Sequence, residues 1–294
     1  MKQTTILKAV ETTGIGLHKG LPIKIRLEPL EANSGIIFER SDLGISFKAS
    51  YENVINTQMA TVIGNDKGYI STVEHLLSAV SAYGIDNLKI IVNANEPPVL
   101  DGSSMGFCSM LDEAGIKELD AKKKIMVIKK EVIVKDGDKY AKLMPTSSPK
   151  LDFTIRFDSS VIGEQQYVFH FNKKNYIEQI AGARTFGFLK DVEALKKANL
   201  GLGGSLDNAI IIDDDKVLNP DGLRYEDEFV RHKILDAIGD LSLLGCRVFG
   251  DYESFAGSHK LNHLLTKEII SNPSAYEIVE LEEDSIKVYE KALA

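Results

Sequence analysis

The stretch 231–241 carries histidine and aspartate side chains at a spacing that could bind a metal ion. Its sequence is RHKILDAIGDL, and apolar residues recur every three or four positions from Val230 onwards, as in an amphipathic helix. On such a helix His232 and Asp236 lie one turn apart, with Asp240 a further turn along. An imidazole and a carboxylate that reach the same point form half of a zinc site. They could equally form an ordinary pair on a solvated face, so further ligands must come from elsewhere.

A second acidic residue and histidine, Glu74 and His75, begin an apolar run with the sequence STVEHLLSA. Ser71 and Glu74 have the spacing of a capping box, which would explain Glu74 but not His75. The position four residues after His75 is an alanine, so this is not the HExxH zinc motif. If His75 joins His232 and Asp236, three protein ligands leave the fourth position of a tetrahedral zinc open. Glu74 would then take a proton from water.

Two further stretches carry groups that would complete a hydrolytic site. GARTFGF at 182–188 places the hydroxyl of Thr185 after a predicted helix, and SHKLNH at 258–263 begins a helix with His259. Amide hydrolysis needs a donor for the oxyanion and a proton for the departing amine, and these two side chains could supply them. His259 and His263 are also four residues apart, so they form a rival metal half-site.

Composition limits the classes of protein to which the chain can belong. The 294 residues suffice for one large domain or two medium ones. A hydrophobic content of 44% and a net charge of -8 fit a soluble globular protein without a nucleic-acid partner. No signal peptide and no transmembrane run of roughly 18 apolar residues is present, which predicts a cytoplasmic protein. Cys108 and Cys246 lie in apolar contexts typical of buried free thiols.

Strand patterns precede helix patterns in both halves of the chain. In the first half, apolar and charged residues alternate over 23–28, and helices are expected at about 71–84 and 104–115. In the second half, apolar runs flank DGD at 136–138, a hairpin signal, and a final helix begins near Ser258. Such elements position the candidate residues on helices packed against sheets.

The charged stretch KELDAKKK at 117–124 is the best candidate for a domain boundary. It predicts an N-terminal domain of residues 1–120 that carries the first acid–histidine pair. A C-terminal domain of residues 125–294 then carries the other candidates, together with an irregular block at about 187–222. The two halves share a broad order of elements, strands first and then helices, without a residue-level repeat.

Taken together, these motifs resemble the UDP-3-O-acyl-N-acetylglucosamine deacetylases (the LpxC family), the zinc amidases of lipid A synthesis. The resemblance spans nearly the whole chain in the family's order, and several separate motifs agree. The motifs are GIGLHKG (14–20), STVEHLLSA (71–79), VLDGSS (99–104), GARTFGF (182–188), RHKILDAIGDL (231–241) and SHKLNH (258–263). The resemblance implies two similar α+β domains, each a β-sheet packed on helices, with the active site between them.

The resemblance also implies a role for each candidate residue. In chain order the implied roles are general base (Glu74), metal ligand (His75), oxyanion donor (Thr185), metal ligand (His232), substrate contact (Lys233), metal ligand (Asp236), orienting carboxylate (Asp240) and general acid (His259). The implied metal is Zn²⁺, with Fe²⁺ as an alternative in the cell. The block 187–222 matches a family insert that forms an apolar passage for the acyl chain. The substrate-binding residues predicted in and beside it are Phe186, Phe188, Leu202 and Gly204.

The implied reaction is hydrolysis of the N-acetyl amide of UDP-3-O-(3-hydroxyacyl)-N-acetylglucosamine to the free amine and acetate. This is an early committed step of lipid A biosynthesis in Gram-negative bacteria, and we expect a monomeric enzyme. The chain departs from the family pattern at 158–160 and 256–258, regions associated with nucleotide contacts, and has Ala60 where many members have cysteine. Two alternatives are a zinc amidase acting on another amide and a structural metal site between domains. A structural site would be closed by four protein ligands and would not need Glu74 or His259.

Overall fold

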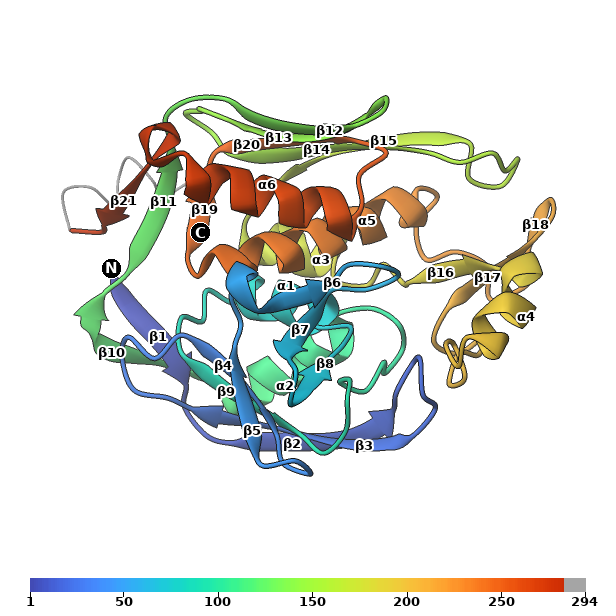
Figure 1. Cartoon of the computed structure of the whole chain (residues 1–294), viewed down its shortest axis with the longest axis horizontal. Coiled ribbons are helices and arrows are strands. Elements are labelled where there is room, and N and C mark those ends of the chain that lie inside the picture. The colour runs from blue at the N-terminus through green and yellow to red at the C-terminus, as the bar shows by residue number, and fades with distance from the viewer. Residues whose placement is uncertain (283–294) are drawn as a thin grey trace.

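Two five-stranded sheets form outer layers of the structure, with helices between them (Figure 1). The structure is a computed structural model and describes residues 1–282. In spatial order, the first sheet contains β2 (Val10–Ile15), β3 (Pro22–Pro29), β9 (Leu88–Val92), β4 (Ile36–Arg40) and β5 (Ile45–Lys48). The second sheet contains β12 (Val132–Asp136), β13 (Lys139–Met144), β20 (Asp251–Phe255), β14 (Lys150–Arg156) and β15 (Glu164–His170).

The two large sheets have the same topology. The central strand of the first, β9, pairs antiparallel with β3 and parallel with β4. The central strand of the second, β20, pairs antiparallel with β13 and parallel with β14. In both sheets two hairpins come first in the chain, and the central strand is added after intervening helices. The predicted α+β fold and the shared layout of the two halves are therefore confirmed at the level of backbone topology.

The layer between the sheets consists mainly of helices from both halves. The helices of this layer are α1 (Glu74–Ala82), α2 (Met105–Ala114), α3 (Lys173–Gln179), α5 (Glu228–Leu241) and α6 (His259–Ser271), whereas α4 (Leu189–Lys197) lies outside it. α2 contacts β2 of the first sheet, whereas α5 and α6 contact β14 and β12 of the second. α1 and α5 pack against each other, so one apolar core runs through the middle of the molecule. Among residues 1–282, no helix has the length and apolar character needed to cross a membrane.

Smaller sheets connect and extend these layers. Their strands are β1 (Lys2–Ile6) with β10 (Ile116–Lys122), β19 (Arg247–Phe249) with β11 (Lys124–Ile128) and β21 (Tyr276–Glu280), β6 (Val54–Asn56) with β7 (Val62–Asn65) and β8 (Gly68–Ile70), and β16 (Phe186–Phe188) with β17 (Ile210–Asp213) and β18 (Lys216–Val217). The last of these sheets and α4 form the insert that projects from one side of the layers (Figure 1).

The charged stretch 117–124 is not a free loop. Most of it lies in β10, which pairs antiparallel with β1, and the next strand begins at Lys124. Between them Lys123 is buried, because its ammonium donates to the carbonyl of Gly84 and to Asp86. The hydrogen bonds of this strand pair tie the crossing point to the N-terminus.

Other local predictions agree with the structure in type and differ in their ends. β3 alternates buried apolar with more exposed residues, as the period of two predicts. Ser258 caps α6, because its hydroxyl accepts a hydrogen bond from the N–H of Leu261. Cys108 is buried and Cys246 half-buried, and both are free thiols.

The capping-box interpretation of Glu74 is wrong. α1 begins at Glu74 itself, and no side chain caps the helix. The carboxylate of Glu74 instead accepts a hydrogen bond from the backbone N–H of Thr61. Glu74 therefore faces a distant part of the chain rather than its own helix start.

Candidate active site

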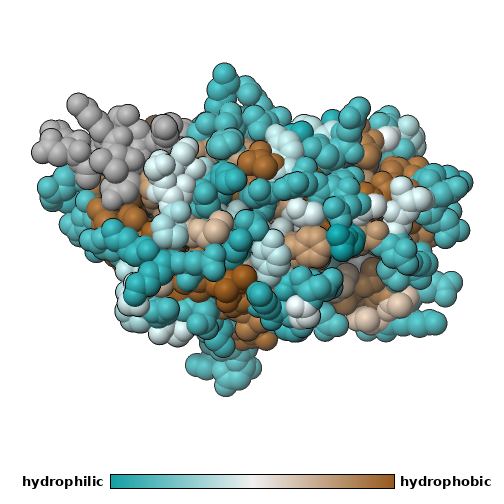
Figure 2. Space-filling model, turned by 90° about the horizontal axis from the view of Figure 1, so that it is seen from above, coloured by the Kyte–Doolittle hydropathy of each residue, from teal (hydrophilic) through white to brown (hydrophobic). Residues whose placement is uncertain are grey.

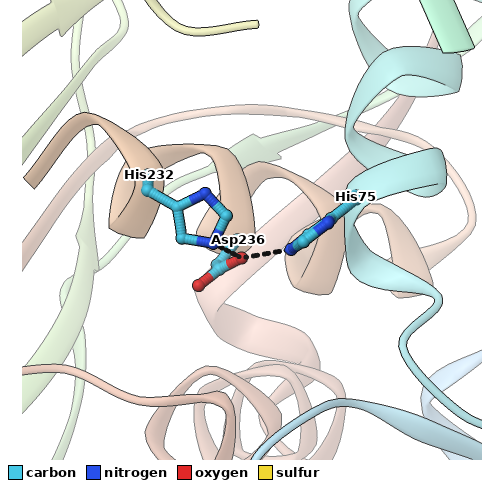
Figure 3. Close-up of side chains that lie close together, drawn as sticks. All are labelled: His75, His232 and Asp236. Carbon is cyan, nitrogen blue, oxygen red and sulfur yellow. Dashed lines mark ion pairs between the residues drawn. The ribbon is translucent and has the colours of Figure 1, made fainter. Parts of the chain in front are cut away.

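A glycine allows α1 and α5 to approach closely enough for their side chains to share one site. A Cβ atom at Gly239 would lie 2.1 Å from the carbonyl oxygen of Glu74, a distance that no side chain tolerates. At this close crossing His75 projects from α1 toward His232 and Asp236 on α5 (Figure 3). The crossing thus brings together the three predicted metal ligands, although His232 and Asp236 follow His75 by 157 and 161 positions in the chain.

The three side chains have a geometry that fits a divalent metal ion. Nε2 of His75 lies 3.5 Å and Nε2 of His232 lies 3.4 Å from Oδ1 of Asp236. A tetrahedral zinc with bonds of about 2.0–2.1 Å separates its ligand atoms by roughly 3.3 Å. Oδ1 of Asp236 is buried and accepts no hydrogen bond from the described residues. Burying a carboxylate oxygen without a partner costs free energy, so this atom is well suited to bind a cation.

Neighbouring groups hold His232 and Asp236 in the protonation states that metal binding needs. Nδ1–H of His232 donates to the carbonyl of Ala183 at 3.0 Å, which leaves Nε2 with its lone pair toward the cluster. Burial lowers the pKa of His232 to about 3, despite the opposing field of Asp236, so the ring is neutral near pH 7. Burial alone would raise the pKa of Asp236, but that pKa lies well below its usual range, and among its neighbours Lys233 carries a positive charge at neutral pH. Lys233 Nζ donates to Oδ2 of Asp236 at 2.9 Å.

A buried carboxylate and a buried imidazole face each other beside the ligand cluster. Oε1 of Glu74 lies 3.7 Å from Nε2 of His259, which is also 3.9 Å from Oδ2 of Asp236. Burial raises the pKa of Glu74, although His259 and His75 oppose the shift. Burial alone would lower the pKa of His259, but Asp240 and Glu74 outweigh it and raise that pKa to about 9. The candidate base and the candidate proton donor therefore lie together beside the candidate metal ligands.

Asp240 is the centre of a hydrogen-bond network that sequence reasoning found only in part. Its Oδ2 accepts from Nδ1–H of His259 at 2.8 Å, which fits the predicted orienting role. The same oxygen accepts from the amide of Asn262 at 2.8 Å, and Asn262 accepts from the hydroxyl of Tyr252 at 2.6 Å. Oδ1 accepts from the hydroxyl of Thr61 at 2.5 Å. The spacing from His259 to Asn262, one helical turn, could have indicated Asn262; no local signal indicates Thr61 or Tyr252.

Two residues in the left-handed backbone region lie just before the candidate base, Glu74, and the candidate acid, His259. Thr72 has φ = 55°, two residues before Glu74, and Ala256 has φ = 47°, three residues before His259. For a β-branched residue this conformation is a true outlier, and such strain costs on the order of 1–3 kcal/mol. Both deviations redirect the chain immediately before a helix whose first turn carries a reactive side chain.

Comparison with known proteins identifies the family. The chain matches the UDP-3-O-acyl N-acetylglycosamine deacetylase family over residues 3–271. The chain belongs to this family. Curated relatives named UDP-3-O-acyl-N-acetylglucosamine deacetylase include proteins from Campylobacter lari, Campylobacter jejuni subsp. doylei and Campylobacter fetus subsp. fetus. They are 69%, 68% and 63% identical to this chain, and each alignment covers 100% of both chains.

In this deacetylase-family chain, Thr185, the predicted oxyanion donor, comes directly after Arg184, which forms a buried ion pair. Arg184 donates from its side chain and its backbone N–H to the carboxylate of Glu228 at the start of α5. The backbone of Thr185 donates to the carbonyl of Gly102 at 2.8 Å and accepts from Ile210 at 2.8 Å. The half-buried Thr185 is thus fixed by its backbone in the loop that accepts the hydrogen bond of His232. That its hydroxyl donates a hydrogen bond to the oxyanion remains a prediction.

Aromatic side chains extend from the metal ligands toward the insert. The ring of Phe186 lies edge-on to His232 at 6.2 Å and beneath the ammonium of Lys233 at 5.6 Å. Phe157 contacts both Phe186 at 5.7 Å and Phe188 at 6.0 Å. The two predicted substrate-binding phenylalanines are therefore continuous with the site through direct ring contacts.

The glycine-containing turn of the insert closes onto the N-terminal half. The N–H of Leu202 donates to the carbonyl of His18 at 3.1 Å. A Cβ atom at Gly203 would lie 2.1 Å from the carbonyl oxygen of Gly16, so only glycine fits there. Leu202 keeps 47% of its surface exposed, and Gly204 is exposed. Both predicted residues therefore lie on the open side of this contact, and their role toward substrate remains a prediction.

The rival metal half-site of His259 and His263 is not assembled. Two sets of metal-type ligands occur among residues 1–282, namely His75 with His232 and Asp236, and Glu74 with Asp236 and His259. His263 belongs to neither set. His259 shares the second set with the candidate base, which is consistent with a site for water and substrate beside the first.

Proposed function

We propose that this chain hydrolyses the N-acetyl amide of UDP-3-O-(3-hydroxyacyl)-N-acetylglucosamine, releasing acetate and the free amine in an early step of lipid A biosynthesis. The family and the names of its relatives support the substrate class and the amide hydrolysis. One observation carries the mechanism: a buried base and a buried proton donor, 3.7 Å apart, lie against three converging metal ligands. A closed structural site would not need that pair.

We assign the metal to His75, His232 and Asp236. Two imidazoles and one carboxylate, with no fourth protein ligand among residues 1–282, form the donor set of a catalytic zinc site, so we propose Zn²⁺ with Fe²⁺ as the alternative. A divalent ion held by these three residues would polarise the amide carbonyl and lower the pKa of water bound to it. Lys233, which donates to the remaining oxygen of Asp236, orients that ligand and lies 5.6 Å from the Phe186 ring.

Glu74 and His259 carry the proton transfers. Water attacks the carbonyl carbon and loses a proton to the carboxylate of Glu74, whose raised pKa makes it a better base than an exposed glutamate. When the carbon–nitrogen bond breaks, Nε2–H of His259 protonates the leaving amine. Asp240 accepts the hydrogen bond from Nδ1–H, which keeps the ring aligned and protonated. Thr185, in the loop beside His232, would donate to the oxyanion that forms between these steps.

The molecule would act as a monomer of two domains, residues 1–120 and 125–294. Within the second domain, the insert would recognise the acyl chain. The support for acyl recognition comes from the aromatic ring contacts that lead from His232 to Phe188 and from the exposed Leu202 and Gly204. Apolar side chains that already lie at the surface can take up methylenes without repacking the core.

Metal analysis combined with a deacetylation assay tests this function. We expect one divalent ion per chain and release of acetate from the UDP-linked substrate. An amidase of the same architecture for another amide would bind the ion but leave that substrate intact. A purely structural metal site would bind the ion and hydrolyse neither this substrate nor other N-acetyl sugars.

A further inference from the structure

Thr61 contacts both the proposed base and the proposed acid pair. It is 2% exposed and directly precedes β7 in the N-terminal half. Its backbone N–H donates to Oε2 of Glu74 at 3.1 Å, and its hydroxyl donates to Oδ1 of Asp240 at 2.5 Å. The same hydroxyl oxygen lies 3.3 Å from Nδ1 of His259. Thr61 is therefore a hydrogen-bonded link between the carboxylate on α1 and the acid pair on α5 and α6.

We propose that Thr61 is a positioning residue that sets the orientation of Asp240, and through it that of His259, relative to Glu74. A threonine hydroxyl has one proton, and here it is given to Oδ1. Oδ2 is then left to accept from His259 and from Asn262, each at 2.8 Å. With both oxygens occupied, the carboxylate cannot rotate away from the imidazole.

The location of Thr61 makes this role more than local. Asp240 follows it by 179 positions, so the bond joins the two halves of the molecule directly at the site. Because the N–H of the same residue holds Glu74, any shift of this segment moves base and acid together. This proposal rests on the proposed function only in its kinetic test, since the alignment of His259 is a property of the protein alone.

Variants that change only the hydroxyl test the role. Thr61→Val keeps the shape and the backbone N–H but removes the donor to Asp240. Loss of a hydrogen bond to a charged group predicts a fall in kcat of roughly 10- to 100-fold, with KM little changed. Thr61→Ser keeps the donor and should retain kcat within about threefold, because only a methyl is lost. Thr61→Ala is the partner of the serine variant, since both lack the methyl and differ only in the hydroxyl.

A double-mutant cycle separates positioning from a general structural effect. If Thr61 acts through Asp240, Thr61→Val should lower kcat much less in an Asp240→Ala background than in the wild type. Independent, multiplying losses would overturn the proposal, and so would equal kcat for the serine and alanine variants. Should the valine variant fail to fold, the serine and alanine pair still decides the question.

A spectroscopic measurement keeps the proposal testable even if the wild type does not hydrolyse the proposed substrate. The proton on Nδ1 of His259, held by Asp240, can be followed by NMR in protein labelled with ¹⁵N-histidine. We expect its resonance to shift or to broaden by exchange in the alanine variant and to be kept in the serine variant. An unchanged resonance in both would refute the positioning role, whereas an inactive wild type with the expected resonances would refute only the proposed function.

Discussion

Helix α5 and the insert around α4 differ most clearly in how deeply their side chains are buried. α5 buries twelve of its fourteen residues, including all of the metal and acid candidates on it, whereas none of the nine residues of α4 is buried. Leu189, Leu202 and Leu206 of the insert are all more than 40% exposed. Viewed from above, hydrophobic and hydrophilic residues are interspersed at the end of the molecule where the insert lies (Figure 2).

This contrast fits the functions that we propose for the two regions. Proton transfer and metal binding need atoms fixed to a few tenths of an ångström, and burial among hydrogen-bond partners provides that. Binding a flexible acyl chain needs apolar surface that is not already used for folding. Substitutions in α5 should therefore affect chemistry strongly, and substitutions in the insert should affect substrate preference.

The largest expected effect comes from removing a metal ligand. His232→Ala should lose the ion and reduce kcat/KM by more than the roughly 10²–10⁴-fold typical of removing a general acid or base. Metal content per chain and acetate release measure the two effects separately. Lys196→Ala on α4 is the control and should change neither. If His259→Ala lost the ion while His75→Ala retained it, the ligand assignment would be wrong.

The next effect is loss of proton transfer with the metal retained. Glu74→Ala and His259→Ala should each keep the ion and lose roughly 10²–10⁴-fold in kcat. The two side chains lie outside the assigned ligand set, so metal content distinguishes them from His232. Variants that lost the ion in proportion to activity would move Glu74 or His259 into the ligand set.

The rate should also depend on pH in two directions. It should rise as Glu74 ionises, at a pH above that of an ordinary glutamate because burial raises its pKa. It should fall as pH rises through the pKa of His259, about 9, because the ring then lacks the proton that the amine needs. His259→Gln should hydrolyse the substrate much more slowly, and its rate should no longer fall at alkaline pH. An unchanged alkaline limb in that variant would exclude His259 as the acid.

The spacing of residues on single helices was the most predictive signal in the sequence. His232, Asp236 and Asp240 recur every four residues, and one helix suffices to place them on one side. The motif order also indicated that His75 would join them. Neither signal contains the reason why two helices can meet so closely, which is the absence of a side chain at Gly239.

Apart from the joining of His75 to α5, long-range contacts were beyond sequence reasoning. Thr61 reaches Asp240 across 179 positions, and nothing in the residues around Thr61 distinguishes it from other threonines. The charged stretch 117–124 is mostly strand because β1, more than 100 positions earlier, is its pairing partner, and its charged residues do not indicate that pairing; the domain boundary placed there stays a prediction. In both cases a partner far away in the chain decides what the segment does.

The smallest expected effect tests the exposed side of the comparison. Leu202 is 47% exposed, so Leu202→Glu should leave folding and metal content intact. If the insert binds the acyl chain, each buried methylene strengthens binding by ~0.8 kcal/mol, and a charge beside it should raise KM for the long-chain substrate roughly 10- to 100-fold. The wild type and Leu202→Glu should hydrolyse a substrate without the acyl chain with equal kcat/KM.

The matched control for this test is Leu43→Glu, at a residue 49% exposed in the turn between β4 and β5. It adds the same charge at the same exposure but lies in another part of the fold, so it should not change the preference for acyl chains. If Leu43→Glu and Leu202→Glu acted alike, a general charge effect would explain both. If the wild type hydrolysed substrates with and without the acyl chain at equal kcat/KM, the insert would have no part in recognition. The contrast would then reduce to a buried amidase site beside an exposed insert of unrelated purpose, because an apolar passage that binds methylenes must discriminate between the two substrates.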